Sequence, residues 1–254
     1  MNQWAVVTGA SSGIGKEFAK QLAAEGMNLV LTARRKDRLD ELAASLKVLN
    51  VEVECVALDL ENREAPWQLF EFTRSQKINP ALLVNNAGFG TYGEVKDLDP
   101  VRQFAMIQVN CAAVATLTSL YLPEMVERGS GEILMVSSTA AFQAVPYETA
   151  YAATKAFDLI FAEGLAEEVK KQGIKVCAVC PGQTESEFQA VAKEKIPKGM
   201  SIHSAEEVAR IGLAALRAGK HLVVCGFSNR MGMELQRLAP RRLVTAISER
   251  MFRP

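Results

Sequence analysis

The feature of this sequence that most constrains its fold is a repeated alternation of short apolar runs with longer amphipathic stretches. Several of the short runs are rich in valine and leucine and lack polar alternation, which is typical of strands covered on both faces. The longer stretches have the length and periodicity of helices. The alternation predicts an α/β fold: a doubly wound parallel sheet of seven strands, with right-handed crossovers and helices on both faces.

The expected elements follow one another without a linker or an internal repeat, so we expect a single domain over residues 1–254. Strands are expected at 4–8, 27–33, 51–58, 81–85, 131–137, 174–180 and 221–225. Helices are expected near 14–25, 37–49, 64–76, 101–128, 150–172 and 204–218. The one long irregular stretch inside the body, 182–203, is expected to be a lid over a binding site.

The chain has 254 residues, a formal net charge of zero, 49% hydrophobic residues and 23% charged residues. This size allows a substantial core, and the neutral balance gives no indication of nucleic acid as a partner. Neither an apolar run of about 18 residues nor a secretory signal is present, so no transmembrane helix is expected. The five cysteines are an odd number, which favours reduced thiols and a cytoplasmic location. Cys177 and Cys180 lie in an expected strand and point to opposite faces, so we expect no redox or metal function there.

A glycine-rich turn follows the first strand and opens a helix; it reads Thr8-Gly9-Ala10-Ser11-Ser12-Gly13-Ile14-Gly15. Its glycines allow a tight turn and the close approach of another backbone. The start of the helix then offers free N–H groups and a positive dipole end to a pyrophosphate. A plain strand-to-helix turn is the alternative. The position in the chain favours dinucleotide binding by Gly9, Ser11, Ser12, Gly13, Ile14 and Gly15.

Tyr151 and Lys155 are four residues apart in an expected helix, so their side chains lie on one face. A nearby ammonium favours the phenolate and lowers the pKa of a tyrosine from about 10. The pair could therefore exchange a proton at neutral pH, with Tyr151 as general acid/base. An ordinary surface pair is the alternative. Ser138 ends an apolar run thirteen residues before Tyr151, and its hydroxyl could stabilise a developing alkoxide.

Together these motifs resemble the short-chain dehydrogenase/reductase family over nearly the whole chain, which implies a Rossmann-type fold. The resemblance selects Ser138 over its neighbour Ser137. Tyr147, the competing tyrosine, lacks a lysine four residues later. The resemblance also adds Asn110, which lies inside an expected helix and would hold a water for proton relay to Lys155. The implied catalytic group is Asn110, Ser138, Tyr151 and Lys155, which requires no metal.

The resemblance further implies contacts to the cofactor. Asp59, with Leu60, would bind the adenine amino group, although a turn aspartate is the structural alternative. Asn86, Ala87 and Gly88 belong to the motif Asn85-Asn86-Ala87-Gly88 and would contact the ribose, as would Tyr151 and Lys155. After Pro181 and Gly182, the hydroxyl that holds the carboxamide would belong to Thr184 or Ser186.

The second expected strand ends in Ala33-Arg34-Arg35-Lys36, where NAD-binding folds usually carry an acidic residue for the ribose 2′-hydroxyl. Cations at the start of a helix are electrostatically unfavourable unless an anion offsets them. The 2′-phosphate of NADP is such an anion, so Arg34 and Arg35 predict NADP(H) as the cofactor. A run of solvated cations is the alternative.

The substrate side is less constrained. Apolar side chains in loops after the strands could line a pocket for a small apolar ketone or aldehyde, or could pack against the body. The candidates are Phe89, Phe142, Val145, Tyr147 and Phe188, with Tyr92 beside them.

Residues 228–254 carry six arginines and two glutamates, interleaved with apolar residues. Such a tail could contact a membrane surface, or it could be a solvated helix that covers the pocket or touches another subunit. It resembles the broad-substrate bacterial branch of the family. The helix from residue 150 presents a wide apolar surface, which predicts a homodimer or homotetramer.

These observations predict an NADP(H)-dependent carbonyl reductase that transfers a hydride between the nicotinamide and its substrate. A 3-oxoacyl-carrier-protein reductase and a non-catalytic dinucleotide-binding sensor are the alternatives.

Overall fold

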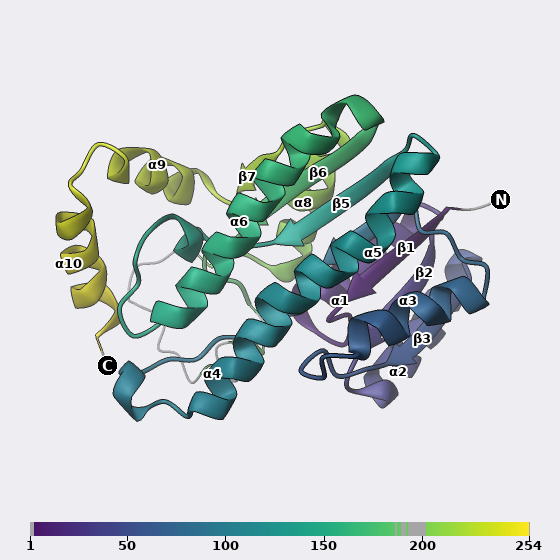
Figure 1. Ribbon diagram of the computed structural model, residues 1–254, viewed down its shortest axis with the longest axis horizontal. Coiled ribbons are helices and arrows are strands. Elements are labelled where there is room, and N and C mark those ends of the chain that lie inside the picture. Colours follow the sequence, from purple (N-terminus) through teal and green to yellow (C-terminus); the bar gives the residue numbers. More distant parts are fainter. Residues whose placement is uncertain (1–2, 186, 189–191, 193–201, 254) are drawn as a thin grey trace.

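The computed structural model describes residues 3–185, 187–188, 192 and 202–253, and its helices lie on both faces of a central parallel sheet (Figure 1). The sheet has seven strands in the order β3-β2-β1-β4-β5-β6-β7, as the apolar runs predict. The strands are β1 (Trp4–Thr8), β2 (Asn28–Ala33), β3 (Val53–Ala57), β4 (Leu82–Asn85), β5 (Gly131–Val136), β6 (Ile174–Cys180) and β7 (Leu222–Val224). The strand order reverses beside β1, and doubly wound sheets bind ligands at the carboxyl ends of the strands there.

The longer helices are α1 (Gly13–Ala24), α2 (Lys36–Leu46), α3 (Ala65–Ser75), α4 (Pro100–Ile107), α5 (Ala113–Glu127), α6 (Thr149–Val169), α8 (Ala205–Arg217), α9 (Phe227–Gln236) and α10 (Arg241–Phe252). Successive strand residues point to opposite faces, so Val7 joins the core under α1, α2 and α8, whereas Val6 joins the core under α3, α5 and α6. The sheet is therefore buried on both faces, which explains its unbroken apolar runs.

The expected helix 101–128 is continuous from Pro100 to Glu127, but residues Gln108–Ala112 form a π-helical turn between α4 and α5. A π turn interrupts the α-helical hydrogen-bond ladder and often marks a functional site. By length and composition this is the one helix in the described part of the chain that could cross a membrane. Its residues Leu117, Tyr121 and Met125 pack into the core, which accounts for the apolar composition.

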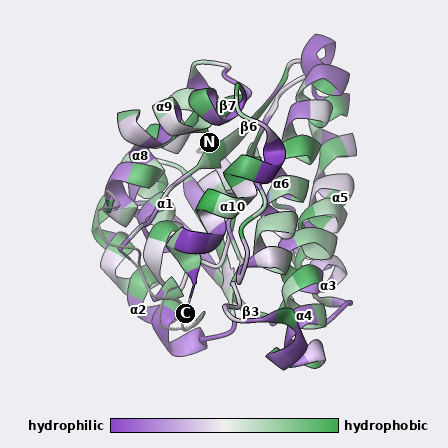
Figure 2. Ribbon diagram, turned by 90° about the vertical axis from the view of Figure 1, so that its left-hand side faces the viewer, coloured by the Kyte–Doolittle hydropathy of each residue, from purple (hydrophilic) through white to green (hydrophobic). Residues whose placement is uncertain are grey.

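The basic tail forms two helices, α9 and α10, which lie beyond the carboxyl ends of the strands (Figure 1). Figure 2 looks onto this end of the molecule and shows apolar and polar residues mixed along both helices. Tyr92 and Tyr147 fasten α10 to the body: the Tyr92 hydroxyl donates to the Phe252 carbonyl at 2.7 Å, and the Tyr147 hydroxyl donates to Glu249 Oε1 at 2.8 Å. The tail is thus part of the fold that surrounds the site.

Candidate active site

A cavity of about 770 Å³ lies at the carboxyl edge of the sheet. Its walls come from the glycine-rich turn, from the loops that follow β2, β3, β4, β5 and β6, and from both tail helices. Most of the residues that the sequence assigns to the site meet here. Those in its wall are Gly9, Ser11, Ser12, Gly13, Ile14, Arg34, Arg35, Asp59, Leu60, Asn86, Ala87, Gly88, Ser138, Tyr151, Lys155, Pro181, Gly182 and Thr184.

The glycine-rich turn is locked against the turn after β4. Gly9 has a φ of +67°, and a Cβ on it would lie 2.8 Å from the Ala87 Cα. The Asn86 side chain donates to the Thr8 carbonyl at 2.8 Å, and the Thr8 hydroxyl accepts from the backbone N–H of Asn86 at 2.9 Å. Gly15 stands behind this joint rather than in the cavity wall, because its Cα faces the Asn86 side chain and the Gly9 carbonyl. The turn therefore needs glycine for backbone packing as well as for ligand approach.

The two arginines after β2 are not isolated cations. Arg34 donates to Glu61 Oε1 at 3.0 Å, and Arg35 donates to the Ser11 and Ser12 hydroxyls and to Glu187 Oε2 at 2.8 Å. Sequence reasoning missed both carboxylates, because they are 27 and 152 residues away along the chain.

Glu187 is the more informative of these two carboxylates. The guanidinium groups of Arg38 and Arg35 lower its pKa to about 2. A carboxylate, which is an anion, thus already occupies the place where the sequence predicts that a phosphate binds.

Asp59 lies near the start of the loop after β3, and its Oδ1 accepts from the Glu61 backbone N–H at 3.0 Å. This is the turn geometry that the structural alternative describes. At the other side of the cavity, the Thr184 hydroxyl donates to the Gly182 carbonyl at 3.1 Å. Ser186, the competing hydroxyl, lies outside the described residues.

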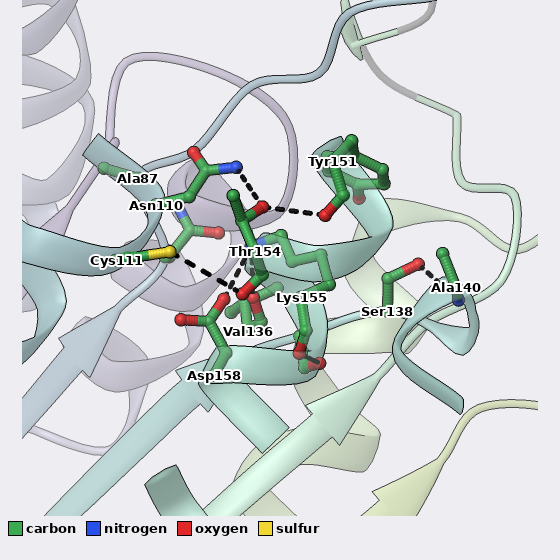
Figure 3. A network of polar contacts seen from close by, with 12 residues as sticks. Ala87, Asn110, Cys111, Val136, Ser138, Ala140, Tyr151, Thr154, Lys155 and Asp158 are labelled. Carbon is green, nitrogen blue, oxygen red and sulfur yellow. Dashed lines mark hydrogen bonds and ion pairs between the residues drawn. The ribbon is translucent and has the colours of Figure 1, made fainter. Parts of the chain in front are cut away.

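Ser138, Tyr151 and Lys155 line the cavity, and the fourth predicted catalytic residue, Asn110, belongs to the polar network that joins it to Thr154 on the same helix as Tyr151 and Lys155 (Figure 3). Tyr151 lies in the first turn of α6, and its ring centre is 5.1 Å from that of Phe188. Ser138 follows β5, and its Oγ accepts from the Ala140 backbone N–H at 3.1 Å, which leaves the hydroxyl hydrogen for another acceptor. Its competitor Ser137 instead donates to the Lys155 carbonyl at 2.7 Å, so Ser137 is engaged in holding α6.

Asn110 is fully buried in the π turn and uses its side chain as a joint. Its Oδ1 accepts from the Phe89 N–H at 3.1 Å, and its Nδ2 donates to the Phe89 carbonyl and to the Thr154 hydroxyl, both at 2.9 Å. Thr154 donates in turn to the Tyr151 carbonyl at 2.7 Å. These bonds connect the loop after β4 to the helix that carries Tyr151, which gives an asparagine inside a helix its structural reason.

Lys155 has a partner that the sequence analysis did not single out. Its Nζ donates to the Val136 carbonyl at 2.8 Å and to Asp158 Oδ2 at 2.9 Å. Burial raises the pKa of the Asp158 carboxyl, and the ammonium opposes that rise. An acidic residue three positions after the lysine was the available signal, but helix surfaces often carry such pairs.

The predicted substrate residues divide into two groups. Phe89, Val145 and Phe188 line the cavity. Phe142 and Tyr147 are not among the described residues of its wall: Phe142 packs against the core, and Tyr147 turns its hydroxyl to Glu249. The tail supplies apolar wall residues that the sequence analysis did not assign to the site, namely Met233, Leu235, Val244, Ile247, Met251 and Phe252.

Known proteins resemble this chain in sequence and in fold. A family model described as short chain dehydrogenase matches residues 3–197. The very-long-chain 3-oxoacyl-CoA reductase of Homo sapiens is 36% identical over 204 residues, which are 78% of this chain and 64% of that protein. The chain thus spans less than two thirds of the length of this relative.

Two solved structures show the same fold. A short-chain dehydrogenase from Sphingobium yanoikuyae in complex with NADPH superposes with a TM-score of 0.84 at 29% identity, over 93% of this chain and 94% of the other. The bulky-bulky ketone specific alcohol dehydrogenase from Comamonas testosteroni has a TM-score of 0.80 at 26% identity, over 93% and 92% of the two chains.

Proposed function

The chain belongs to the short-chain dehydrogenase family, and from this premise we propose that it is an NADP(H)-dependent carbonyl reductase. It would transfer a hydride between the nicotinamide and the carbonyl or alcohol carbon of a small apolar ketone or aldehyde. The observation that carries the proposal is the meeting of Tyr151, Lys155 and Ser138 in the wall of one cavity that apolar side chains enclose.

The residues of the cavity fit a dinucleotide. Gly9 and Gly13 have positive φ angles, and the turn they form leads into the N-terminus of α1, where N–H groups and the helix dipole favour a pyrophosphate. Arg35 contacts the hydroxyls of Ser11 and Ser12 in this same turn, so a guanidinium stands beside the predicted phosphate site. The neighbour solved with NADPH supports the choice of NADP(H).

Once bound, the nicotinamide supplies or accepts the hydride. The protein's own part is proton transfer and polarisation. Tyr151 gives a proton to the carbonyl oxygen, and the Lys155 ammonium one turn later favours the phenolate that remains. The Ser138 hydroxyl donates a hydrogen bond to the same oxygen and stabilises its developing charge. Asn110 hydrogen-bonds both the loop after β4 and Thr154 of α6, which fixes the position of Tyr151 relative to that loop.

We also propose a cytoplasmic homo-oligomer. The homo-oligomer is supported by an exposed apolar surface on α4 and α6, where Val101, Phe104 and Ile160 are 74%, 71% and 69% exposed. Apolar patches of this kind on soluble proteins commonly mark contacts between subunits. Light scattering at micromolar concentration should give the mass of a dimer or tetramer, and the mass of a monomer would contradict the proposal.

A second candidate is reduction of a 3-oxoacyl thioester, since the human relative is a very-long-chain 3-oxoacyl-CoA reductase. One assay separates the candidates: NADPH oxidation measured across bulky ketones, aldehydes, 3-oxoacyl-CoA and 3-oxoacyl-carrier-protein thioesters. We expect the highest kcat/KM with the apolar ketones and aldehydes. A strong preference for thioesters would favour the second candidate. NADPH binding without turnover on any substrate would favour a dinucleotide sensor and overturn the proposal.

A further inference from the structure

We propose that Asp158 is a positioning residue for the acid–base step. Its carboxylate holds the Lys155 ammonium beside the cavity and sets how strongly that ammonium acts on Tyr151. The inference rests on the proposed function, because it concerns the proton that Tyr151 exchanges. It adds a residue to the four that the family resemblance supplies.

The geometry places the three side chains in one row. Tyr151, Lys155 and Asp158 are spaced by four and three residues on α6, so they lie on one face of the helix. Asp158 Oδ2 is 2.9 Å from Lys155 Nζ, and the two side chains are only 3% and 6% exposed (Figure 3). The carbonyl of Val136 at 2.8 Å is the second acceptor for the ammonium. These two acceptors therefore fix the position of the Lys155 ammonium, while the lysine side chain still forms part of the cavity wall.

Stability alone does not explain a carboxylate at this position. Burying two charges costs free energy that their attraction only partly offsets, and apolar replacements of buried pairs are often neutral or stabilising. Asp158 Oδ1 is buried and has no hydrogen-bond partner among the described residues. An acceptor left unsatisfied in the interior is a further cost. The buried carboxylate thus costs free energy of folding. Among the described residues, its ion pair with Lys155 is the interaction that offsets part of this cost.

Among the described titratable groups that face Lys155 from neighbouring elements and from its own helix, Asp158 is the one that supplies a negative charge. Cys111, in the π turn, and Cys180, on β6, are the titratable groups that face the pair from the neighbouring elements. Burial raises the pKa of the Cys111 thiol to about 11 and raises that of Cys180 further, so both are neutral at physiological pH. In the described part of the chain, Asp158 is the carboxylate within ion-pair distance of Lys155.

A negative charge behind the ammonium offsets part of the positive potential that reaches Tyr151. If that charge is removed and the ammonium stays, the phenolate of Tyr151 is favoured and its pKa falls. Two unit charges about 10 Å apart, at an effective dielectric constant between those of a protein surface and water, shift a pKa by roughly half a unit to one unit. The substitution Asp158→Asn removes the charge and keeps the shape and an oxygen acceptor for Lys155.

The test is a spectrophotometric titration of the phenolate in protein without cofactor. The chain has four tyrosines, so subtracting the titration of a Tyr151→Phe partner of each variant isolates Tyr151. We expect the Tyr151 midpoint in Asp158→Asn to lie about half a unit to one unit below that of the wild type. Asp158→Ser, which also removes the charge, should give a shift of the same sign and serves if the asparagine variant does not fold.

Two controls separate this effect from a structural one. Asp158→Glu keeps the charge, so its midpoint should match the wild type even where its melting temperature is lower. Glu163→Gln removes a charge from the exposed side of the same helix and should leave the midpoint unchanged. An unchanged or raised midpoint in Asp158→Asn and Asp158→Ser, or an equal shift in Glu163→Gln, would overturn the proposal. The titration needs no turnover, so its result can still be interpreted if the protein reduces none of the substrates in the NADPH assay.

Discussion

Two ion pairs contribute residues to the wall of the same cavity and have nearly the same length; we call the part around Lys155 its buried end and the part around Arg35 and Glu187 its exposed end. Lys155 and Asp158 are 2.9 Å apart with side chains 6% and 3% exposed, whereas Arg35 and Glu187 are 2.8 Å apart with side chains 40% and 45% exposed. Water screens the second pair and hardly reaches the first. An exposed pair contributes about 0–1 kcal/mol, so an incoming anion can replace its carboxylate at little cost. Removing one partner from a buried pair leaves an uncompensated charge, so the buried pair is a fixed part of the site.

The comparison suggests different tasks for the two ends. The buried end holds the group that we propose to transfer a proton, in a set electrostatic environment, and small changes there should alter the rate of the reaction. The exposed end holds Arg35, whose partner Glu187 an incoming anion can replace. Changes there should alter the choice of cofactor and its affinity. The predictions below test this division from its largest expected effect to its smallest.

At the buried end, Tyr151→Phe should lower kcat/KM on a good substrate by about 10²- to 10⁴-fold, because general acid/base catalysis is lost. NADPH affinity, measured by fluorescence titration, should stay within about twofold, since the ring and its packing against Phe188 are kept. Tyr121→Phe is the matched control, because the Tyr121 hydroxyl bonds Thr73 in the core, away from the cavity. Turnover within threefold of the wild type would contradict the proposed mechanism.

At the exposed end, Arg34→Ala/Arg35→Ala should reduce the preference for NADPH over NADH by roughly 10- to 150-fold, since a hydrogen bond to a charged group contributes about 1.5–3 kcal/mol. The measurement is kcat/KM with each cofactor. Arg38→Ala is the control, because Arg38 contacts Glu187 but is absent from the described cavity wall. A wild type that uses both cofactors equally, or a double variant with unchanged preference, would refute the assignment.

The Glu187 carboxylate, which pairs with Arg35 and Arg38, should compete weakly with the cofactor phosphate. Glu187→Gln should therefore tighten NADPH binding by about two- to fivefold, in line with the value of an exposed ion pair. The gain should shrink at about 1 M salt, where the Debye length is only about 3 Å. Glu185→Gln, an exposed carboxylate two residues earlier, should leave the Kd unchanged. Weaker binding by Glu187→Gln would show that the carboxylate supports the cofactor instead.

The smallest effect is one of pH. The pKa of Glu187 is lowered to about 2 from its ordinary value of 4.5, so its pairing is complete above the ordinary value and is lost as the pH falls toward 2. Between about pH 4 and 5 the paired carboxylate stays ionised, whereas a carboxylate at its ordinary pKa would take up a proton, and a phosphate with a second pKa of about 6 keeps its charge. The ratio of the NADP⁺ Kd values of wild type and Glu187→Gln should thus be constant over this range. A ratio that changes more than twofold would mean that the arginines do not hold the carboxylate in solution.

The sheet could be predicted well because its signals are local. Strand and helix periodicity depends on neighbouring residues, and β1 and β6 begin and end where the apolar runs do. The glycine-rich turn and the spacing of Tyr151 and Lys155 are equally local, so the sequence placed both in the site.

What could not be predicted depends on residues that meet only in the folded chain. The carboxylates beside Arg34 and Arg35 come from other loops, and a run of three cations gives no sign of them. The π turn at Asn110 has no periodicity signal, because it inserts within an otherwise regular helix. Tyr147 looked like a pocket residue by composition, but its φ of +69° and its bond to Glu249 turn it toward the tail. Such outcomes follow from tertiary contacts that override local preference.

The tail affects how the site can change in evolution. The family match ends at residue 197, yet the wall of the cavity continues through α9 and α10 as far as Phe252. The residues proposed for hydride and proton transfer all precede this segment. The apolar wall is therefore shared between the matched segment, which supplies Phe89, Val145 and Phe188, and the tail, and contacts such as the Tyr92 hydroxyl on the Phe252 carbonyl join the two. We therefore expect that recombination or grafting of the last helices between relatives varies the range of substrates while the residues proposed for proton transfer are kept.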